Sequence, residues 1–325
     1  MPADKKNIWV LKDDRISNFK QIEAISNFLS SKSTNIINKS ITYNKTIFLP
    51  NFARNCFQIK SVSLKLSDII NKDFPDLILS AGRRCASIAL QIKKQSGNKS
   101  KIIQLMRPNP YNKNFDFIIT PKHDNYKYAN YENITTPNSI NNKLLEESLP
   151  DWPILNQLTK PKIALIVGGS TKKANIRPSH FAKMSETISN KTAELDGSIL
   201  VTTSRRTGIK NEQIILSHLS DPHYIFTWQE KLSTNPYYAI LAQADYIIIT
   251  GDSISMISDA CATGKPVYIY DKKFGNSKHR KFQQYLYDKK IAKPYTEFLK
   301  KPESWNYTPI NEAKNIADII KKKFL

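Results

Sequence analysis

A run of small polar residues separates two apolar runs in the stretch YIIITGDSISMISDACATGKPVYIY, residues 246 to 270. Gly251 ends the first apolar run, and Asp252 or Ser253 can cap a helix that follows it. The N–H groups in the first turn of such a helix have no partner within the helix, and the helix dipole favours negative charge there. The spacing therefore predicts a diphosphate site around Gly251, Ser253 and Ser255.

Asp259 lies about two turns further along the same predicted helix. Its carboxylate could accept hydrogen bonds from a ribose diol, although an ordinary solvated helix residue is an equally open interpretation. Simple capping likewise accounts for Ser253 and Ser255 without a ligand. Asp252 brings negative charge toward the predicted phosphates, so we expect it to cap the helix, to pair with a cation or to contact something other than phosphate.

Glycine is scarce, with only nine in 325 residues, so its positions are informative. Gly82, Gly168, Gly169 and Gly251 all lie where an apolar run ends and a helix is expected to begin. At such turns α/β sheets bind their ligands, and the backbone must approach a phosphate closely. Tight turns between strand and helix need glycine without any ligand as well. The three glycines in the second half of the chain, however, together predict a phosphate-binding edge that includes the Gly168-Gly169-Ser170 turn.

Strands and helices alternate along the chain, and this alternation must position those residues. Apolar and β-branched runs predict strands at 7–12, 75–82, 101–106, 115–121, 161–170, 197–204, 223–228, 246–250 and 267–270. Apolar residues at helical spacing predict helices at 18–30, 84–94, 178–193, 209–219 and 236–243. Strands separated by helices are typical of βαβ units, so we expect an α/β fold with parallel sheets.

The chain is longer than one typical domain of about 100 to 200 residues. Around 151–160 the sequence is interrupted by prolines and has no clear periodicity, which is typical of a linker. We therefore predict an N-terminal Rossmann-like domain over 1–150, a linker over 151–160 and a C-terminal domain over 161–303. A helical segment over 304–325 is expected to return to the N-terminal domain.

The formal net charge of +21 suggests a polyanionic partner, such as an anionic membrane surface or nucleic acid. Lysine, asparagine and isoleucine are abundant throughout, so an AT-rich genome explains the charge about as well. Basic residues concentrate at 93–101, 272–281 and 321–323. They do not alternate with aromatic residues that could stack on bases, so nucleic acid is the weakest of these partners.

Cysteine usage and hydropathy indicate the compartment. Cys56, Cys85 and Cys261 are widely spaced and have no histidine cluster near them, so we expect neither a disulfide framework nor a zinc site. The pair Asp13-Asp14 is too generic to predict a metal site. No stretch approaches the ~18 to 20 apolar residues of a membrane span. These features predict a cytoplasmic protein in a reducing compartment.

Five further motifs stand out in the sequence: SAGRR (80–84), LIVGGSTK (165–172), VTTSRRT (201–207), NPYYAILAQAD (235–245) and TGDSISMISDACATGKPV (250–267). Together they resemble the plant mitochondrial-fission family, named for elongated mitochondria, and its bacterial relatives. The resemblance covers nearly the whole chain and is most specific over 161–285. The family's Asp-Gly-x-x-Gly-x-x-x-Gln loop is altered, because Asp14 and Ser17 replace the glycines while Gln21 remains.

That family in turn resembles B-type glycosyltransferases, which have the GT-B fold. The resemblance implies two Rossmann-like domains with parallel sheets that face each other across a cleft. It places the acceptor side in the domain over 1–150 and the nucleotide-sugar site in the domain over 161–303. Asp259 stands where a ribose-binding glutamate stands in such enzymes. The implied reaction is transfer of a sugar from a nucleotide-diphosphate donor, without a metal and without any cofactor besides the donor.

Such a reaction needs cations and a base. Negative charge builds up on the leaving diphosphate, and Arg205 with Arg206 could stabilise it, unless both only belong to a solvated loop. A base for the acceptor hydroxyl should come from the N-terminal domain, where His123 and Asp124 follow a strand, although a histidine there is more often structural. Trp228 either stacks on the nucleobase or, as is more common, packs in the core.

Three other functions compete with that of a glycosyltransferase. A dehydrogenase is disfavoured because the G-x-G-x-x-G fingerprint is absent. A sugar-nucleotide epimerase shares the two-domain architecture and stays open. So does a non-catalytic adaptor that brings a dynamin-like or other protein partner to a membrane. We favour a glycosyltransferase at the inner face of the cytoplasmic membrane that uses a lipid-linked or envelope glycan acceptor, which the basic composition also suits.

Overall fold

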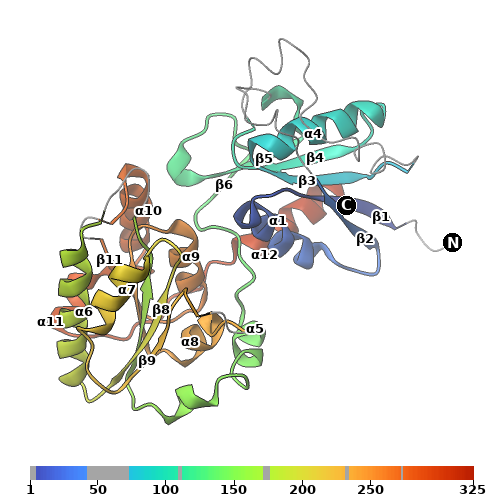
Figure 1. Cartoon of the computed structure of the whole chain (residues 1–325). Coiled ribbons are helices and arrows are strands. Elements are labelled where there is room, and N and C mark those ends of the chain that lie inside the picture. The colour runs from blue at the N-terminus through green and yellow to red at the C-terminus, as the bar shows by residue number, and fades with distance from the viewer. Residues whose placement is uncertain (1–4, 42–72, 109–111, 171–175, 231–233, 272–273) are drawn as a thin grey trace. The chain divides into compact units, whose positions relative to one another are not determined.

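The computed structural model describes residues 5–41, 73–108, 112–170, 176–230, 234–271 and 274–325 (Figure 1). The chain forms two compact units. The first unit comprises Met1–Asn138 together with Asn311–Leu325, and the second comprises Ser139–Ile310. Cys56 and the start of the basic segment 272–281 lie outside the described residues.

The first unit is an α/β layer structure around one parallel sheet. Among its described residues the strand order is β2-β1-β3-β4-β5-β6, and every neighbouring pair is parallel. The strands are β1 (Lys6–Lys12), β2 (Thr34–Ser40), β3 (Leu77–Ala81), β4 (Lys101–Leu105), β5 (Phe117–Pro121) and β6 (Tyr131–Asn133). The helices α1 (Ile16–Leu29) and α12 (Glu312–Phe324) cover one face, and α4 (Gly82–Gln95) covers the other (Figure 1).

The second unit repeats this architecture. Its described residues form a parallel sheet in the order β12-β11-β10-β7-β8-β9. The strands are β7 (Lys162–Val167), β8 (Ser198–Thr203), β9 (His223–Phe226), β10 (Tyr246–Thr250), β11 (Val267–Tyr270) and β12 (Ala292–Pro294). One face is covered by α5 (Asn142–Glu147), α8 (Tyr237–Gln243), α9 (Ile254–Ala262) and α10 (Ser277–Asp288). The other is covered by α6 (Pro178–Ala193), α7 (Ile209–Leu216) and α11 (Tyr295–Lys300).

Burial on both faces explains why the central strands have continuous apolar sequences. In β10 the three consecutive side chains of Ile247, Ile248 and Ile249 are all fully buried, although they alternate between the two faces of the sheet. A parallel sheet that is covered by helices on both sides needs such runs rather than an alternating pattern. The sequence prediction of an α/β fold with two parallel sheets is therefore confirmed.

The division between the units differs from the one drawn from the sequence. The segment predicted as a linker, 151–160, belongs to the second unit, because the fully buried Leu155 packs in the same core as Ile240 and Leu241 of α8. A short segment without periodicity can still bury one large side chain, and periodicity does not report that. Near the C-terminus the chain re-enters the first unit at Asn311, and α12 packs against α1.

Each sheet has a switch point, at which successive crossover connections change direction. Ligands of open α/β sheets bind at the carboxyl ends of the strands beside such a point. In the first sheet this switch point lies between β1 and β3, and in the second it lies between β7 and β10. Asp13 and Gly82 follow the strands at the first switch point. Gly168 and Gly251 follow them at the second. Two of the predicted glycine turns thus meet at the switch point of the second sheet.

Three strands, β2, β6 and β12, have no counterpart among the sequence predictions. Two of them have only three residues, and β2 is a polar edge strand, TNIINKS, whose pairing comes from its neighbour β1. Edge strands tolerate polar side chains because one of their sides meets solvent.

Within the described ranges, no helix has both the length and the apolar character needed to cross a bilayer.

Candidate functional site

The switch point of the second sheet holds a tight polar cluster. The N–H of Gly168 donates a hydrogen bond to Thr250 Oγ1 (2.7 Å), and the N–H of Gly169 donates to Asp252 Oδ2 (3.0 Å). The guanidinium of Arg206 lies 2.8 Å from the same Asp252 oxygen. The Asp252 side chain is wholly buried, whereas that of Arg206 is one-third exposed (33%). Asp252 therefore pairs with a cation, which is one of the three outcomes that its sequence position allowed.

Both glycines at the end of β7 are required by close contacts within the protein. A Cβ on Gly168 would lie 2.2 Å from each carboxylate oxygen of Asp252, and a Cβ on Gly169 would lie 2.0 Å from the carbonyl oxygen of Arg206. The hydroxyl of Thr207 closes this turn by donating to the Gly168 carbonyl (2.6 Å). The turn is thus filled on one side by the loop after β8, and only its remaining side can meet a ligand.

The predicted helix after Gly251 is α9. Ser253 is its N-cap, and its hydroxyl accepts a hydrogen bond from the Met256 N–H at 3.5 Å. The exposed Ser255 lies beside it, with the two hydroxyl oxygens 3.4 Å apart. The Gly251 carbonyl accepts a hydrogen bond from Gln283 of α10 (2.7 Å). These contacts fix the start of α9, whose first-turn N–H groups carry the positive end of the helix dipole.

Two side chains of α10 support the cluster and were not among the predicted site residues. Gln283 holds Gly251, and His279 forms a capping box with Asn276, whose N–H donates to His279 Nδ1 (3.1 Å). Burial lowers the pKa of His279 below its usual value; the Asp252 carboxylate opposes this shift and the Arg206 charge adds to it. The imidazole is therefore neutral at pH 7. The Asn-x-x-His spacing of a capping box was the sequence signal available for this helix start.

Asp259 lies in the second turn of α9, facing α8. Its Oδ2 accepts a hydrogen bond from the Tyr237 hydroxyl at 3.3 Å. Burial raises the pKa of Tyr237 far above its usual value, and the negative charge of Asp259 adds to that shift, so this phenol stays a hydrogen-bond donor. The carboxylate is half-buried rather than fully solvated. Asp259 is therefore not an ordinary solvated helix residue, because it is held by Tyr237.

The two adjacent arginines differ in their contacts, and the last residue of the glycine turn is held by a hydrogen bond of its own. Arg206 is held by Asp252, while its neighbour Arg205 is exposed. Ser170 Oγ accepts a hydrogen bond from the Ile176 N–H at 3.0 Å. Of the predicted binding residues, Gly168, Gly169 and Arg206 are thus brought into direct contact with one another or with a shared partner.

Trp228 follows β9 at the same edge of the second sheet. Its side chain is 50% exposed, so the interpretation of Trp228 as a core residue is wrong. Its backbone N–H donates to Thr203 Oγ1 at the end of β8 (2.8 Å), and that strand is hydrogen-bonded to β7. A large aromatic face is therefore anchored at the strand ends, two strands away from the Gly168 turn.

The two predicted catalytic residues belong to the first unit. His123 and Asp124 lie in the short 3-10 helix η3 (Lys122–Asp124), directly after β5. The Asp124 carboxylate lies 3.7 Å from Nε of Arg107, whose guanidinium also donates to the Asp124 carbonyl. The same guanidinium stacks on the ring of Tyr126, 5.3 Å from its centroid. Asp124 is thus engaged in a structural ion pair, and both residues are half-buried.

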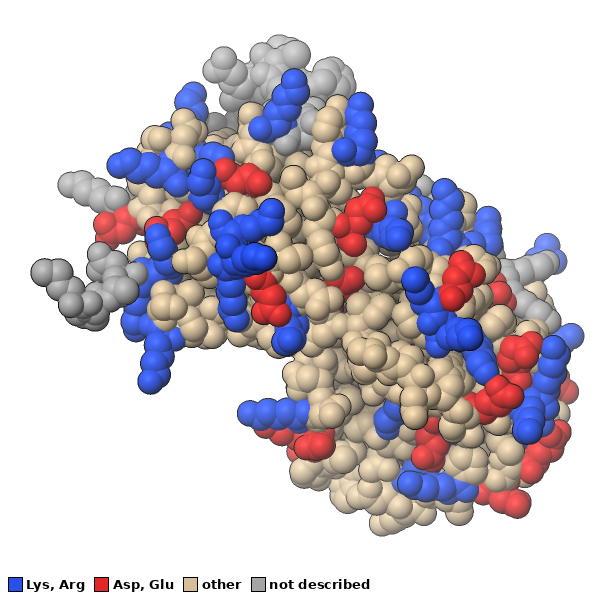
Figure 2. All heavy atoms as spheres, turned by 180° about the vertical axis from the view of Figure 1, so that it is seen from behind, with Lys and Arg blue, Asp and Glu red and all other residues tan. Residues whose placement is uncertain are grey.

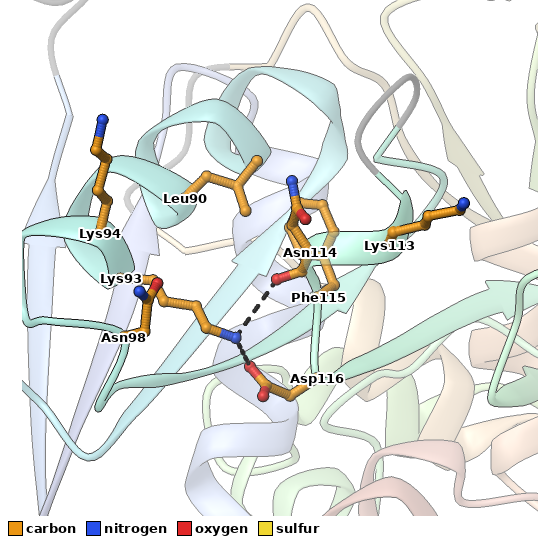
Figure 3. A pocket seen from close by; sticks show the side chains of 8 residues that line it. All are labelled: Leu90, Lys93, Lys94, Asn98, Lys113, Asn114, Phe115 and Asp116. Carbon is orange, nitrogen blue, oxygen red and sulfur yellow. Dashed lines mark hydrogen bonds and ion pairs between the residues drawn. The ribbon is translucent and has the colours of Figure 1, made fainter.

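A cavity of about 690 Å³ lies at the opposite, amino-terminal edge of the first sheet (Figure 3). Lys93 reaches into it and pairs with Asp116 at 2.6 Å, and Asp116 also accepts the Ile102 N–H (2.8 Å). Burial would raise the pKa of Asp116, but these hydrogen bonds and the Lys93 and Lys101 charges lower it below its usual value. The carboxylate of this cavity is thus already held by Lys93, and we assign the cavity no function. Over the described part of the chain, no cluster of three or more His, Cys, Asp or Glu side chains could hold a metal ion.

Sequence comparison identifies relatives along almost the whole chain. The family model described as "Mitochondrial fission ELM1" matches residues 18–324. The chain belongs to this family. An uncharacterized protein of Rickettsia prowazekii is 34% identical over 359 residues, covering 97% of this chain and 98% of that protein. The mitochondrial fission protein ELM1 of Arabidopsis thaliana is 26% identical over 329 residues, covering 94% of this chain and 74% of that protein. The family resemblance inferred from the motifs is confirmed.

Solved structures share the fold of this family member. The UDP-GlcNAc 2-epimerase of Neisseria meningitidis, solved bound to UDP-GlcNAc, superposes with a TM-score of 0.58 at 12% identity and covers 97% of this chain and 98% of its own. MurG of Acinetobacter baumannii superposes with a TM-score of 0.57 at 11% identity and covers 98% and 99%. At such low identity the likeness shows the fold alone. It is the GT-B arrangement of two parallel α/β sheets that the sequence predicted.

Proposed function

We propose that the chain transfers a sugar from a nucleotide-diphosphate donor to a lipid-linked or envelope glycan acceptor. The observation that carries the proposal is the cluster at the switch point of the second sheet, where the glycine turn, Arg206 and the start of α9 meet. A switch point with a helix N-terminus suits a diphosphate, and Arg206, whose charge Asp252 balances, holds the turn in place there. Proteins of the same fold support the donor class, since one of them was solved bound to UDP-GlcNAc.

Each proposed donor contact follows from the geometry of the second unit. The first-turn N–H groups of α9, together with Ser253 and Ser255, would bind the diphosphate, and the exposed Arg205 would add positive charge. Asp259 would accept hydrogen bonds from the ribose, and the exposed ring of Trp228 would stack on the base. In the first unit, His123 and Asp124 remain candidates for the base, although the ion pair with Arg107 reduces the availability of Asp124.

A thermal-shift screen tests this proposal directly. The purified full chain is melted with UDP, ADP, GDP and UDP-N-acetylglucosamine, and a ligand at about 100 times its dissociation constant should add roughly 2.7 kcal/mol of stability. Incubation with the sugar nucleotide then separates the enzymes of this fold. Released UDP supports a transferase, whereas an isomerised sugar nucleotide would support an epimerase. If no nucleotide in the screen stabilises the chain, the donor proposal fails.

A non-catalytic adaptor is the second candidate, because a curated relative bears the name of a mitochondrial fission protein. Lys and Arg side chains are spread over the face drawn in Figure 2, with Asp and Glu among them. The lysines at 93–94 and 321–323 lie in the last turns of α4 and α12, where positive charge also complements the helix dipole. Flotation with anionic liposomes tests membrane attachment: we expect binding at low salt that is lost at high salt. If the chain does not float at low salt, the charge serves no membrane.

A further inference from the structure

The second unit contains a buried carboxylate that the proposed donor contacts do not use. Glu212 lies in the first turn of α7 and is 3% exposed. Its Oε1 accepts a hydrogen bond from the Thr203 hydroxyl at 2.6 Å. The dipole of α7 favours negative charge in that turn, which accounts for the charge of Glu212 but not for its burial. A buried carboxylate is costly unless donors reach it, so the Thr203 hydroxyl is an important partner.

Thr203 connects this carboxylate to the backbone of Trp228. It is the last residue of β8 and is itself buried. Its Oγ1 accepts a hydrogen bond from the Trp228 N–H at 2.8 Å. A hydroxyl has one hydrogen and two lone pairs, so donation to Glu212 leaves the lone pairs to accept from Trp228. The three groups thus form a chain of hydrogen bonds that ends on a charged acceptor, which strengthens such bonds.

This chain holds the backbone beyond the point at which strand pairing stops. β9 ends at Phe226, and its pairing with β8 ends there too, so Trp228 is held by the Thr203 side chain alone. Glu230 holds the residue in between: its Oε1 accepts from the Thr227 N–H at 2.9 Å, and its own N–H donates to the Thr227 carbonyl at 3.1 Å. A fixed backbone that carries a half-exposed aromatic ring is the arrangement of a preformed binding surface, because a ligand then has little to order.

We propose that Glu212 and Thr203 are positioning residues of the donor site, which hold the ring of Trp228 in place for stacking on the nucleobase. Neither side chain touches the ligand, and both act through the Trp228 backbone. The inference rests on the proposed function, in which Trp228 stacks on the base. It divides donor binding into two parts: the contribution of the base depends on this chain of hydrogen bonds, whereas that of the diphosphate, at the start of α9, does not.

Titration calorimetry with the full chain tests the role of Glu212. The probe is UDP, or ADP or GDP where the thermal-shift screen selects one of them, and pyrophosphate, which has no base, is titrated in competition with it. Glu212→Met removes the acceptor of the Thr203 hydroxyl at similar side-chain size, and Glu212→Gln restores an acceptor oxygen. We expect Glu212→Met to weaken nucleotide binding about fivefold, the scale of one lost stacking contact, and Glu212→Gln to stay within about twofold of wild type. Pyrophosphate should bind equally to all three proteins.

A second series changes Thr203 and leaves the carboxylate in place. Thr203→Val removes the hydroxyl at the same shape, and Thr203→Ser keeps it. Thr202→Val is the matched control, because that buried side chain lies on the other face of β8. We expect only Thr203→Val to weaken nucleotide binding, again about fivefold. The double variant Glu212→Met/Thr203→Val removes both side-chain partners, so it leaves no buried carboxylate without a donor, and it serves where a single variant does not fold.

The sharpest test combines Thr203→Val with Trp228→Ala. In that background Thr203→Val should cause no further loss of nucleotide affinity, because the ring that it positions is gone. A further loss would overturn the proposal, as would a loss of pyrophosphate binding equal to that of the nucleotide, since either result is expected of a merely structural network. Unchanged nucleotide affinity in Glu212→Met and Thr203→Val would overturn it too. If wild type binds none of UDP, ADP and GDP, it is the donor proposal that fails, and this inference falls with it.

Discussion

The switch points of the two sheets each contain a buried aspartate, and the two aspartates have different surroundings. In the second unit Asp252 accepts from the Gly169 N–H and pairs with Arg206 through one oxygen. In the first unit Asp13 accepts only from the Arg15 N–H and has no ion pair within the described structure. The second oxygen of each aspartate is buried and has no hydrogen-bond donor among the described residues. A buried carboxylate in an ion pair holds the loops around it together, whereas one without an ion pair is costly to keep in its charged form. Residue type and place in the fold are alike, so the partners decide the role.

The largest expected effect follows from removing the cation of the second unit. Arg206→Met leaves the fully buried Asp252 carboxylate without its ion pair, and we expect the free energy of unfolding to fall by about 3 kcal/mol. Arg205→Met is the matched control, because that side chain is exposed and should change stability by less than about 0.5 kcal/mol. Urea unfolding measures both. Equal stability of the two variants would mean that Asp252 does not depend on Arg206.

The glycine turn beside that ion pair gives the next effect. In Gly169→Ala the new Cβ would meet the Arg206 carbonyl, which belongs to the backbone and cannot rotate away, so we expect a loss of about 2 kcal/mol. Gly97→Ala is the comparison, because a Cβ there would meet only open space. We expect that variant to lose only about 1 kcal/mol of stability, owing to the positive φ of Gly97. A smaller loss for Gly169→Ala than for Gly97→Ala in thermal unfolding would contradict the contact.

The proposed ribose contact tests whether the second unit binds a nucleotide beside its structural cluster. We expect Asp259→Ala to weaken UDP binding by about 2 kcal/mol, the scale of hydrogen bonds to a charged group. Tyr237→Phe removes only the hydrogen bond that Asp259 makes within the protein and should leave most of the affinity in place. Titration calorimetry with UDP measures the affinity of both variants. Unchanged UDP affinity in a folded Asp259→Ala protein would remove that residue from the site.

The exposed tryptophan gives a smaller effect that depends on the base. Trp228→Ala should weaken UDP binding by about 1 kcal/mol through lost stacking, while pyrophosphate, which has no base, should bind as before. Little stability should be lost because half of the side chain is already in water. If both ligands lose affinity equally, Trp228 acts on the fold of the site and not on the base.

The smallest effect is expected in the first unit, and it has the opposite sign. The pKa of Asp13 is raised in the folded protein, so folding favours its protonated form. The cost of Asp13 to folding is therefore absent at low pH, where it is protonated in both states, and complete above its folded pKa. Asp13→Asn should leave stability at pH 3 unchanged and raise it at pH 7 by up to about 1 kcal/mol. A loss of stability at pH 7 would show that Asp13 has a structural role like that of Asp252.

The sequence predicts the strands and their ends well because burial on both faces imposes long apolar runs, such as the three isoleucines of β10. It also places Gly168, Gly169 and Gly251 at the edge where they lie, because scarce glycines mark tight turns. The polar edge strand β2 escapes prediction, since its place in the sheet depends on pairing with β1 and not on its own side chains.

The roles of individual polar residues could not be read from local patterns. Arg205 and Arg206 are adjacent and of the same type, yet only Arg206 reaches Asp252, which is 46 residues away in the sequence. Gln283 contacts Gly251 across a similar separation of 32 residues. Asp13-Asp14 is generic as a dipeptide, and only the fold distinguishes a buried carboxylate from an exposed one. Such pairings are set by the tertiary structure, on which sequence spacing carries no direct information.

The return of the chain into the first unit constrains the order in which the protein can fold during synthesis. The second unit is a continuous segment, Ser139–Ile310, whereas the core of the first unit joins Ile22 and Ile25 of α1 to Ile316 and Ile320 of α12. A ribosome releases the N-terminus first, and domains generally fold as units while they emerge. The second unit can therefore finish folding while the nascent first unit still exposes the apolar face of α1. That face is covered only after nearly the whole chain has been translated, which makes the earliest part of this protein the last to be completed.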